Sequence, residues 1–131
     1  MLKELKESMN NQINAIQNYY NILDGIVIAT DSYFKKKHSF QHPLAAVAWV
    51  WDNFDIWITE SVIAEDVDCI FTIVIFDNND PDGKVYSSLD IIDIGKGKFK
   101  ARKVNIEENN ETLINYFTEI EKYVNTFKGV K

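Results

Sequence analysis

The sequence predicts a single α+β domain, residues 1–131, in which an N-terminal and a C-terminal helix pack on a five- to six-stranded, mostly antiparallel meander sheet. Three observations predict this fold class. Apolar residues recur at intervals of three or four near both ends of the chain, which is typical of amphipathic helices. Apolar and polar residues alternate through much of the middle, which is typical of strands with one buried face. The length and the apolar content of 46% suit one domain with a substantial core.

The first predicted helix covers residues 2–23. Its apolar side chains form one stripe, namely Leu2, Leu5, Met9, Ile13, Ile16, Tyr20 and Leu23. Asp24-Gly25 is predicted to end the helix, because glycine readily adopts the left-handed conformation that follows a helix C-terminus. We expect the stripe to pack on the protein's own sheet, and the alternative is a coiled-coil seam in a homodimer. Residues 26–29 are then predicted to form a short strand.

Residues 30–43 form the least regular connection in the chain and contain both histidines, His38 and His42. Long connections of this kind are functional more often than short ones, so this segment is a candidate binding loop. The spacing of the histidines would suit a metal ion only on a helix, which Pro43 disfavours, and no glutamate follows His38 as a metalloprotease requires. We therefore expect no metal site here.

Residues 44–76 are the densest apolar stretch and are predicted to form three sequential antiparallel strands. In the first two strands, bulky apolar residues occupy alternate positions, namely Val47, Trp49 and Trp51, then Phe54, Ile56 and Ile58. Asp52-Asn53 lies between them and suits a two-residue hairpin turn. The third strand, residues 69–76, is β-branched and aromatic throughout, so we expect both of its faces to be covered.

A cluster of turn formers at residues 77–84 precedes a strand at 85–94, a tight reversal at Gly95-Lys96-Gly97 and a returning strand at 98–104. A three-residue reversal would place Asp90 opposite Arg102, and a two-residue reversal would place Asp93 opposite Lys98. The returning strand is rich in cations, which protects a sheet edge from aggregation. An anion or RNA contact is the alternative. These cations are Lys96, Lys98, Lys100, Arg102 and Lys103.

The last predicted helix is capped by Asn109 or Asn110, and Gly129 follows it as a stop. Glu111 favours its first turn, where the helix dipole attracts negative charge. Its apolar face is wide and consists of Leu113, Tyr116, Phe117, Ile120, Tyr123, Val124 and Phe127.

No motif in the chain predicts catalysis. Residues 78–83 match the first half of an EF-hand calcium loop, but Leu89 stands where calcium requires a bidentate glutamate. The one cysteine, Cys69, lies in a strand interior, where we expect a buried, inert thiol. Residues 95–98 lack the spacing and the hydroxyl of a phosphate-binding loop. We therefore predict no catalytic residues, no metal and no cofactor, and we expect that the protein is not an enzyme.

Negative charge is concentrated in one part of the chain. The net charge is −6, and residues 52–93 hold eleven acids against one base, Lys84. Such a field repels nucleic acid and anionic lipid and attracts basic protein surfaces. The longest apolar run, Leu44 to Trp51, is far too short to span a membrane. A single cysteine suits a reducing compartment, so we expect a cytoplasmic protein.

Charge and missing motifs together predict a non-enzymatic interaction module that binds a basic protein partner. An inhibitor or immunity-type protein, for example from a phage or another mobile element, would block a nucleic-acid-binding partner in this way. The acids expected to contribute are Asp52, Asp55, Glu60, Glu65, Asp66, Asp68, Asp77, Asp80 and Asp82.

Two other hypotheses remain open. The first is a small-molecule pocket or weakly marked enzyme between the sheet and the N-terminal helix, lined by Tyr33, Trp49, Trp51 and Trp57. The second is a homodimeric acidic chaperone for a secreted protein.

Overall fold

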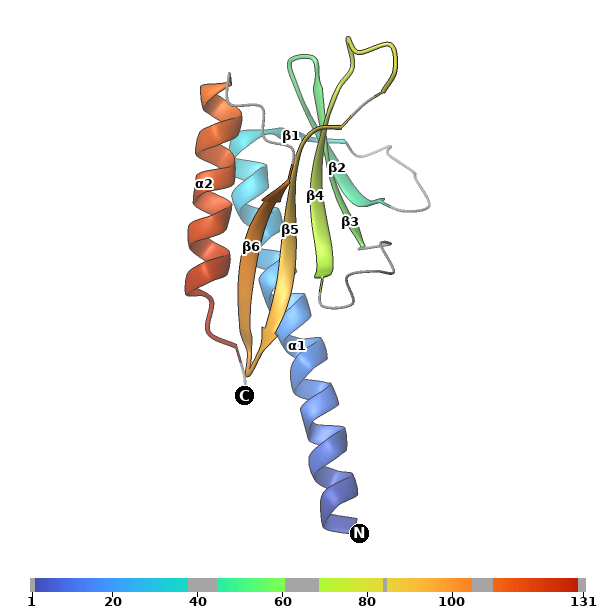
Figure 1. The fold of residues 1–131 in the computed structure, drawn as a ribbon, viewed down its shortest axis with the longest axis vertical. Helices are drawn as coiled ribbons and strands as arrows, with labels where there is room; N and C mark the ends of the chain where they lie inside the picture. The colour runs from blue at the N-terminus through green and yellow to red at the C-terminus, as the bar shows by residue number, and fades with distance from the viewer. Residues whose placement is uncertain (1, 38–44, 61–68, 84, 105–109, 130–131) are drawn as a thin grey trace.

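The computed structural model describes residues 2–37, 45–60, 69–83, 85–104 and 110–129. Two helices flank six strands along the chain (Figure 1). The elements are α1 (Leu2–Tyr33), β1 (Lys35–Lys36), β2 (Ala45–Trp51), β3 (Phe54–Glu60), β4 (Cys69–Asp77), β5 (Val85–Gly95), β6 (Lys98–Val104) and α2 (Glu111–Thr126). The strands form one antiparallel sheet in the order β1-β2-β3-β4-β5-β6. The predicted α+β meander is confirmed.

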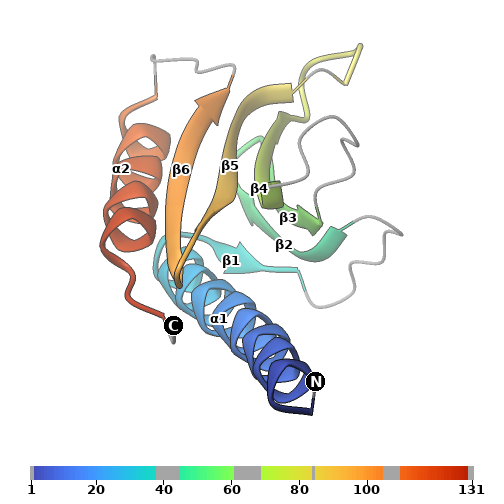
Figure 2. The same ribbon diagram turned by 60° about the horizontal axis from the view of Figure 1, so that its bottom comes forward.

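Both helices contribute to one core on a single face of the sheet, which we call the helix face. Alternate strand residues point into this core, among them Ile56 and Ile58 of β3 and Ile73 and Ile75 of β4, all fully buried. Figure 2 shows the sheet curling from β6 to β1, with α2 alongside β6. The predicted apolar face of α2 is confirmed by the burial of Leu113, Tyr116, Phe117, Ile120 and Val124.

The predicted end of the first helix is wrong, because α1 continues through Asp24-Gly25 and ends at Tyr33. Gly25 lies against α2, and a Cβ atom there would overlap the side chain of Tyr123. The Tyr123 hydroxyl donates a hydrogen bond to the Asn21 carbonyl oxygen at 3.1 Å. Helix packing, and not a C-terminal cap, therefore accounts for this glycine. The strand predicted at residues 26–29 is also wrong, because these residues continue α1. Ile26 is buried in the core from this helix.

The expectation that the apolar stripe of α1 packs on the sheet is also wrong. Its members from Leu2 to Tyr20 are 55–74% exposed, and they are Leu2, Leu5, Met9, Ile13, Ile16 and Tyr20. The buried face of α1 is instead formed by Asn18, Ile22, Ile26 and Thr30 in its second half. Figure 1 shows the N-terminal half of α1 extending beyond the sheet.

The described part of the candidate binding loop, residues 30–37, belongs largely to two elements. Residues up to Tyr33 end α1, and Lys35–Lys36 forms β1, which pairs with β2. β1 begins nine residues after the start of the strand predicted at 26–29, which is helical. Both histidines lie outside the described residues.

The turns set the register of the remaining strands. Asp52 has the positive φ of 53° that the predicted hairpin requires. In the β5–β6 hairpin, Asp90 faces Arg102, as one of the two predicted registers has it, with a bulge between Asp93 and Gly95. β4 is not fully covered on both faces as expected, because only Cys69, Ile73 and Ile75 are buried in it.

The start of α2 is as predicted. Asn110 is the N-cap, and its side-chain oxygen accepts a hydrogen bond from the Leu113 backbone nitrogen at 3.2 Å.

Candidate functional site

Two turns meet at one end of the sheet, at the top of Figure 1. The β2–β3 turn contains Asp52 and Asn53, and the β4–β5 turn begins after Asp77. The backbone nitrogen of Asn78 donates to the Asn53 carbonyl oxygen at 2.8 Å. The Asn53 side-chain nitrogen donates to Asp77 Oδ1 at 2.6 Å. These bonds hold four carboxylates at one end of the molecule, which we call the acidic end: Asp52, Asp77, Asp80 and Asp82.

Local hydrogen bonds orient two of these carboxylates. Asp77 Oδ1 also accepts from the Asn79 backbone nitrogen at 2.9 Å, and Asp80 Oδ1 accepts from the Asp82 backbone nitrogen at 2.9 Å. Asp52 and Asp82 are exposed. Within the described part of the chain, none of the four forms an ion pair. Their negative charge is therefore presented to solvent without a matching cation from these residues.

The other predicted acids do not join this group. Asp55 forms an ion pair with Lys37 at 3.0 Å, and its side chain is only 14% exposed. Glu60 ends β3, whereas the acidic end lies where β3 begins. The remaining three, Glu65, Asp66 and Asp68, lie outside the described residues. The structure thus gathers four of the nine predicted acids and separates two.

The four aromatic residues predicted for a pocket take part in packing. Trp49 is fully buried, and its Nε1 donates to Asp31 Oδ1 at 2.7 Å. Trp51 stacks on Phe54, and Tyr33 lies against Tyr116 with ring centroids 5.4 Å apart. Trp57 lies on the opposite face of the sheet, against Phe76, at 4.7 Å.

A hollow of about 330 Å³ lies between α1 and the β5–β6 hairpin, and none of those four aromatics lines it. Asn11, Asn14 and Asn18 contribute carboxamides from α1. Asp93 faces them, but Tyr19 donates to its Oδ2 and the Gly95 backbone nitrogen to its Oδ1, both at 2.8 Å. These asparagines recur at intervals of three and four residues, which indicates one polar face of the helix. The sequence prediction considered only the apolar stripe on the other side of α1. Both Asp93 oxygens are engaged, and Lys96 is the other charged residue in the lining.

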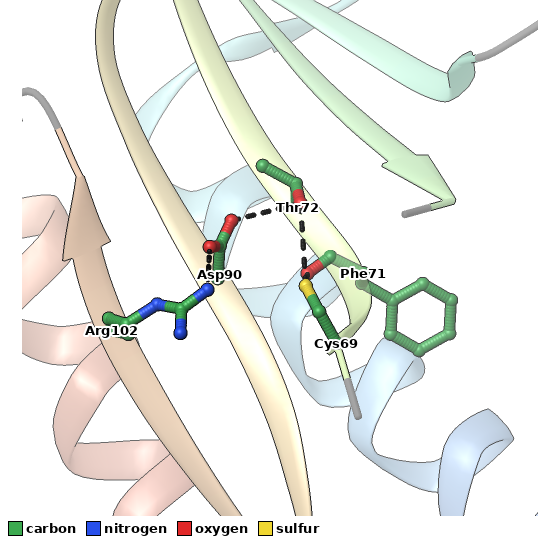
Figure 3. A network of polar contacts seen from close by, with 5 residues as sticks. All are labelled: Cys69, Phe71, Thr72, Asp90 and Arg102. Carbon is green, nitrogen blue, oxygen red and sulfur yellow. Dashed lines mark hydrogen bonds and ion pairs between the residues drawn. The ribbon is translucent and has the colours of Figure 1, made fainter. Parts of the chain in front are cut away.

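A polar network crosses the sheet face opposite the helices (Figure 3). Asp90 accepts from Arg102 Nη2 at 2.8 Å and from Thr72 Oγ1 at 3.1 Å. Cys69 Sγ lies 3.7 Å from Thr72 Oγ1 and 3.5 Å from the Phe71 carbonyl oxygen. A hydroxyl and a carbonyl do not stabilise a thiolate as a cation would, so this geometry favours an inert thiol. The sequence predicted the Asp90–Arg102 pair but gave no signal for Thr72.

Burial and hydrogen bonding raise the pKa of three tyrosines where the helices meet the core. Burial raises the pKa of Tyr116 far above its usual value, and its hydrogen bond with Thr30 opposes the shift only in part. A hydrogen bond with Glu119 is the largest cause of the raised pKa of Tyr33. Burial, then the nearby Asp24 carboxylate, raises the pKa of Tyr123.

Within the described ranges, no three His, Cys, Asp or Glu side chains gather in a way that could hold a metal ion. In the same part of the chain, neither helix has a stretch long and apolar enough to cross a membrane. Comparison with protein-family models, curated proteins and solved structures finds no match to this chain.

Proposed function

We propose that this protein is a non-enzymatic interaction module that binds a basic protein surface through the acidic end. The observation that carries the proposal is the convergence of Asp52, Asp77, Asp80 and Asp82 on two hydrogen-bonded turns. An inhibitor or immunity-type protein that occupies the nucleic-acid-binding surface of its partner is the class that this arrangement fits best.

Geometry and electrostatics both support this assignment over catalysis. Asp52 lies in the short β2–β3 turn and Asp77 ends β4, so the sheet fixes their positions, and a backbone hydrogen bond from Asp82 orients Asp80. Ordered carboxylates lose little conformational entropy on binding. Carboxylates without matching cations accelerate encounter with a basic partner and exclude anionic ones. Two carboxylates can act as general acid and general base only when both are aimed at one substrate position. Asp77 Oδ1 and Asp80 Oδ1 instead accept hydrogen bonds from the backbone of their own turn.

The test is binding of a synthetic lysine-rich peptide, measured by fluorescence anisotropy at low and at high salt. We expect the wild-type affinity to fall steeply with salt, because exposed charges are screened over about 10 Å at 0.1 M ionic strength. The triple variant Asp52→Asn/Asp80→Asn/Asp82→Asn should weaken binding at low salt by roughly tenfold or more. Asp77 is left in place because it holds the two turns together.

The matched control is Glu4→Gln/Glu7→Gln/Asp24→Asn, which removes the same charge from exposed positions on α1. It should retain most of the wild-type affinity. Equal losses in the two variants would show a general effect of net charge and would contradict the proposal, as would the absence of any binding at low salt.

A further inference from the structure

The N-terminal half of α1 presents an apolar surface that the described part of the chain does not cover. From Leu2 to Tyr20, six apolar side chains on one stripe are each more than half exposed. At 1.5 Å per residue, this stripe is about 27 Å long. Monomeric proteins rarely expose a contiguous apolar patch of more than a few hundred Å². We propose that the protein is a homodimer in which the N-terminal halves of two α1 helices pack antiparallel along this stripe.

The helical form of residues 2–13 is a second indication that a partner covers this surface. No side chain from residue 2 to residue 13 is buried. The segment includes Ser8, Asn10 and Asn11, which have poor helix propensity. Most helical stability in proteins comes from packing of an apolar face and not from helix propensity. Packing against a second helix supplies the stabilisation that the protein's own sheet does not provide here.

The spacing of the stripe identifies the partner as a second copy. Six of its seven members, counting Leu23, form three pairs at equal distances from the midpoint between Gln12 and Ile13, and the seventh, Ile13, faces Gln12 of the partner subunit. A two-fold interface requires this self-complementarity, because each patch must meet its own copy. In an antiparallel pair centred there, Leu2 faces Leu23 of the partner subunit, Leu5 faces Tyr20 of the partner subunit, and Met9 faces Ile16 of the partner subunit.

The surroundings of the stripe fit a second copy better than a charged partner. No charged residue occurs between Glu7 and Asp24, so the flanks of the stripe are neutral and match those of an identical helix. The side of α1 that lines the hollow, with Asn11, Asn14 and Asn18, lies away from the stripe. A partner helix therefore approaches without meeting the β5–β6 hairpin. Two such stripes bury on the order of 1,000 Å² in total, the lower range for a specific interface.

The test is a charge exchange at positions that face each other only in the antiparallel pair, measured on the full chain by sedimentation velocity over a concentration series. The wild type should reach twice the chain mass of 15.2 kDa. Met9→Lys alone and Ile16→Glu alone should each raise the dimer dissociation constant by roughly tenfold or more. The double variant Met9→Lys/Ile16→Glu should restore the dimer, because each introduced lysine then faces an introduced glutamate of the other copy.

The matched control is Asn10→Lys/Gln17→Glu, which carries the same charges at the same separation but one position further along the helix, off the stripe. It should dimerise like the wild type. Near-ultraviolet circular dichroism establishes that each variant keeps its packed core. A monomeric wild type, or single variants that remain dimeric, would overturn the proposal. A double variant that stays monomeric would also overturn the antiparallel arrangement. In a parallel pair, each position faces its own copy, so like charges would meet and the double variant would not restore the dimer. None of these measurements depends on the acidic end.

Discussion

The two helices carry apolar stripes of similar regularity and use them in opposite ways. In α2, the stripe lies in the core, where Tyr116, Ile120 and Val124 are fully buried. In the first half of α1, the stripe faces away from the protein, and Ile13 is 60% exposed. Periodicity therefore establishes that a helix has a face to cover, but not what covers it. The difference arises because α1 is twice as long as α2, 32 residues against 16, and extends beyond the sheet.

The largest expected effect is a difference in stability between two variants, each of which truncates one residue of one stripe. Ile120→Ala should lower the free energy of unfolding by about 2–5 kcal/mol, because it leaves a cavity in a packed core. Ile13→Ala should change it by less than about 0.5 kcal/mol when the protein is dilute enough to be monomeric. Urea unfolding of both variants at the same low concentration measures the contrast. Equal losses would mean that the stripe of α1 is covered within one chain.

A smaller effect is expected where the two helices touch. Gly25→Ala improves helix propensity by about 1 kcal/mol but forces a methyl group into the Tyr123 ring, and overpacking of this kind costs about 1–3 kcal/mol. We expect a net loss of stability, visible as a lower midpoint in thermal unfolding. In a Tyr123→Ala background, the same Gly25→Ala change should become stabilising. If the sign does not reverse, the glycine serves some purpose other than close approach.

The smallest effect concerns the hydrogen bond between Thr30 of α1 and Tyr116 of α2, whose oxygens are 2.7 Å apart. Burial raises the pKa of Tyr116. The stabilisation of the folded protein that comes from protonated Tyr116 is therefore complete below the unfolded-state pKa of about 10. It is lost as the pH rises above that value. Tyr116→Phe should be less stable than the wild type at neutral pH. The slope of its stability against pH above that point should be shallower by up to about 1.4 kcal/mol per unit.

Denaturant unfolding across a pH series measures this difference. Tyr20→Phe is the control, because Tyr20 is 63% exposed and its removal should leave the slope unchanged. Parallel curves for the wild type and Tyr116→Phe would show that Tyr116 is not held protonated by its surroundings.

Local chemistry predicted most of the sheet and all of α2. The Asp52-Asn53 turn and the glycines of the β5–β6 reversal are determined by neighbouring residues, so their hairpins and the Asp90–Arg102 pairing could be foreseen. The end of α1 could not, because the role of Gly25 depends on Tyr123, which is distant in the sequence. Glycine near the end of an apolar stripe favours a cap locally, and only tertiary contact overrides that preference.

The acidic end was predictable as composition but not as geometry. The excess of acids in residues 52–93 is visible in the sequence, but their grouping depends on strand pairing. β3 and β4 pair from Phe54–Asp77 onward, which brings the turn before β3 beside the turn after β4. The pairing of Asp55 with Lys37 depends on β1, a two-residue strand with no detectable periodicity. Short edge strands of this kind are defined by their partner and not by their own sequence.

The unbroken course of α1 makes the helix a rigid lever about 48 Å long. Its tip lies outside the body of the protein, and its other end is anchored by Thr30 in the core and by the bond from Trp49 to Asp31. Without a hinge at Gly25, a force applied at the tip is transmitted along the rod to those anchors. A partner that binds the N-terminal half of α1 is thereby mechanically linked to the packing of the sheet.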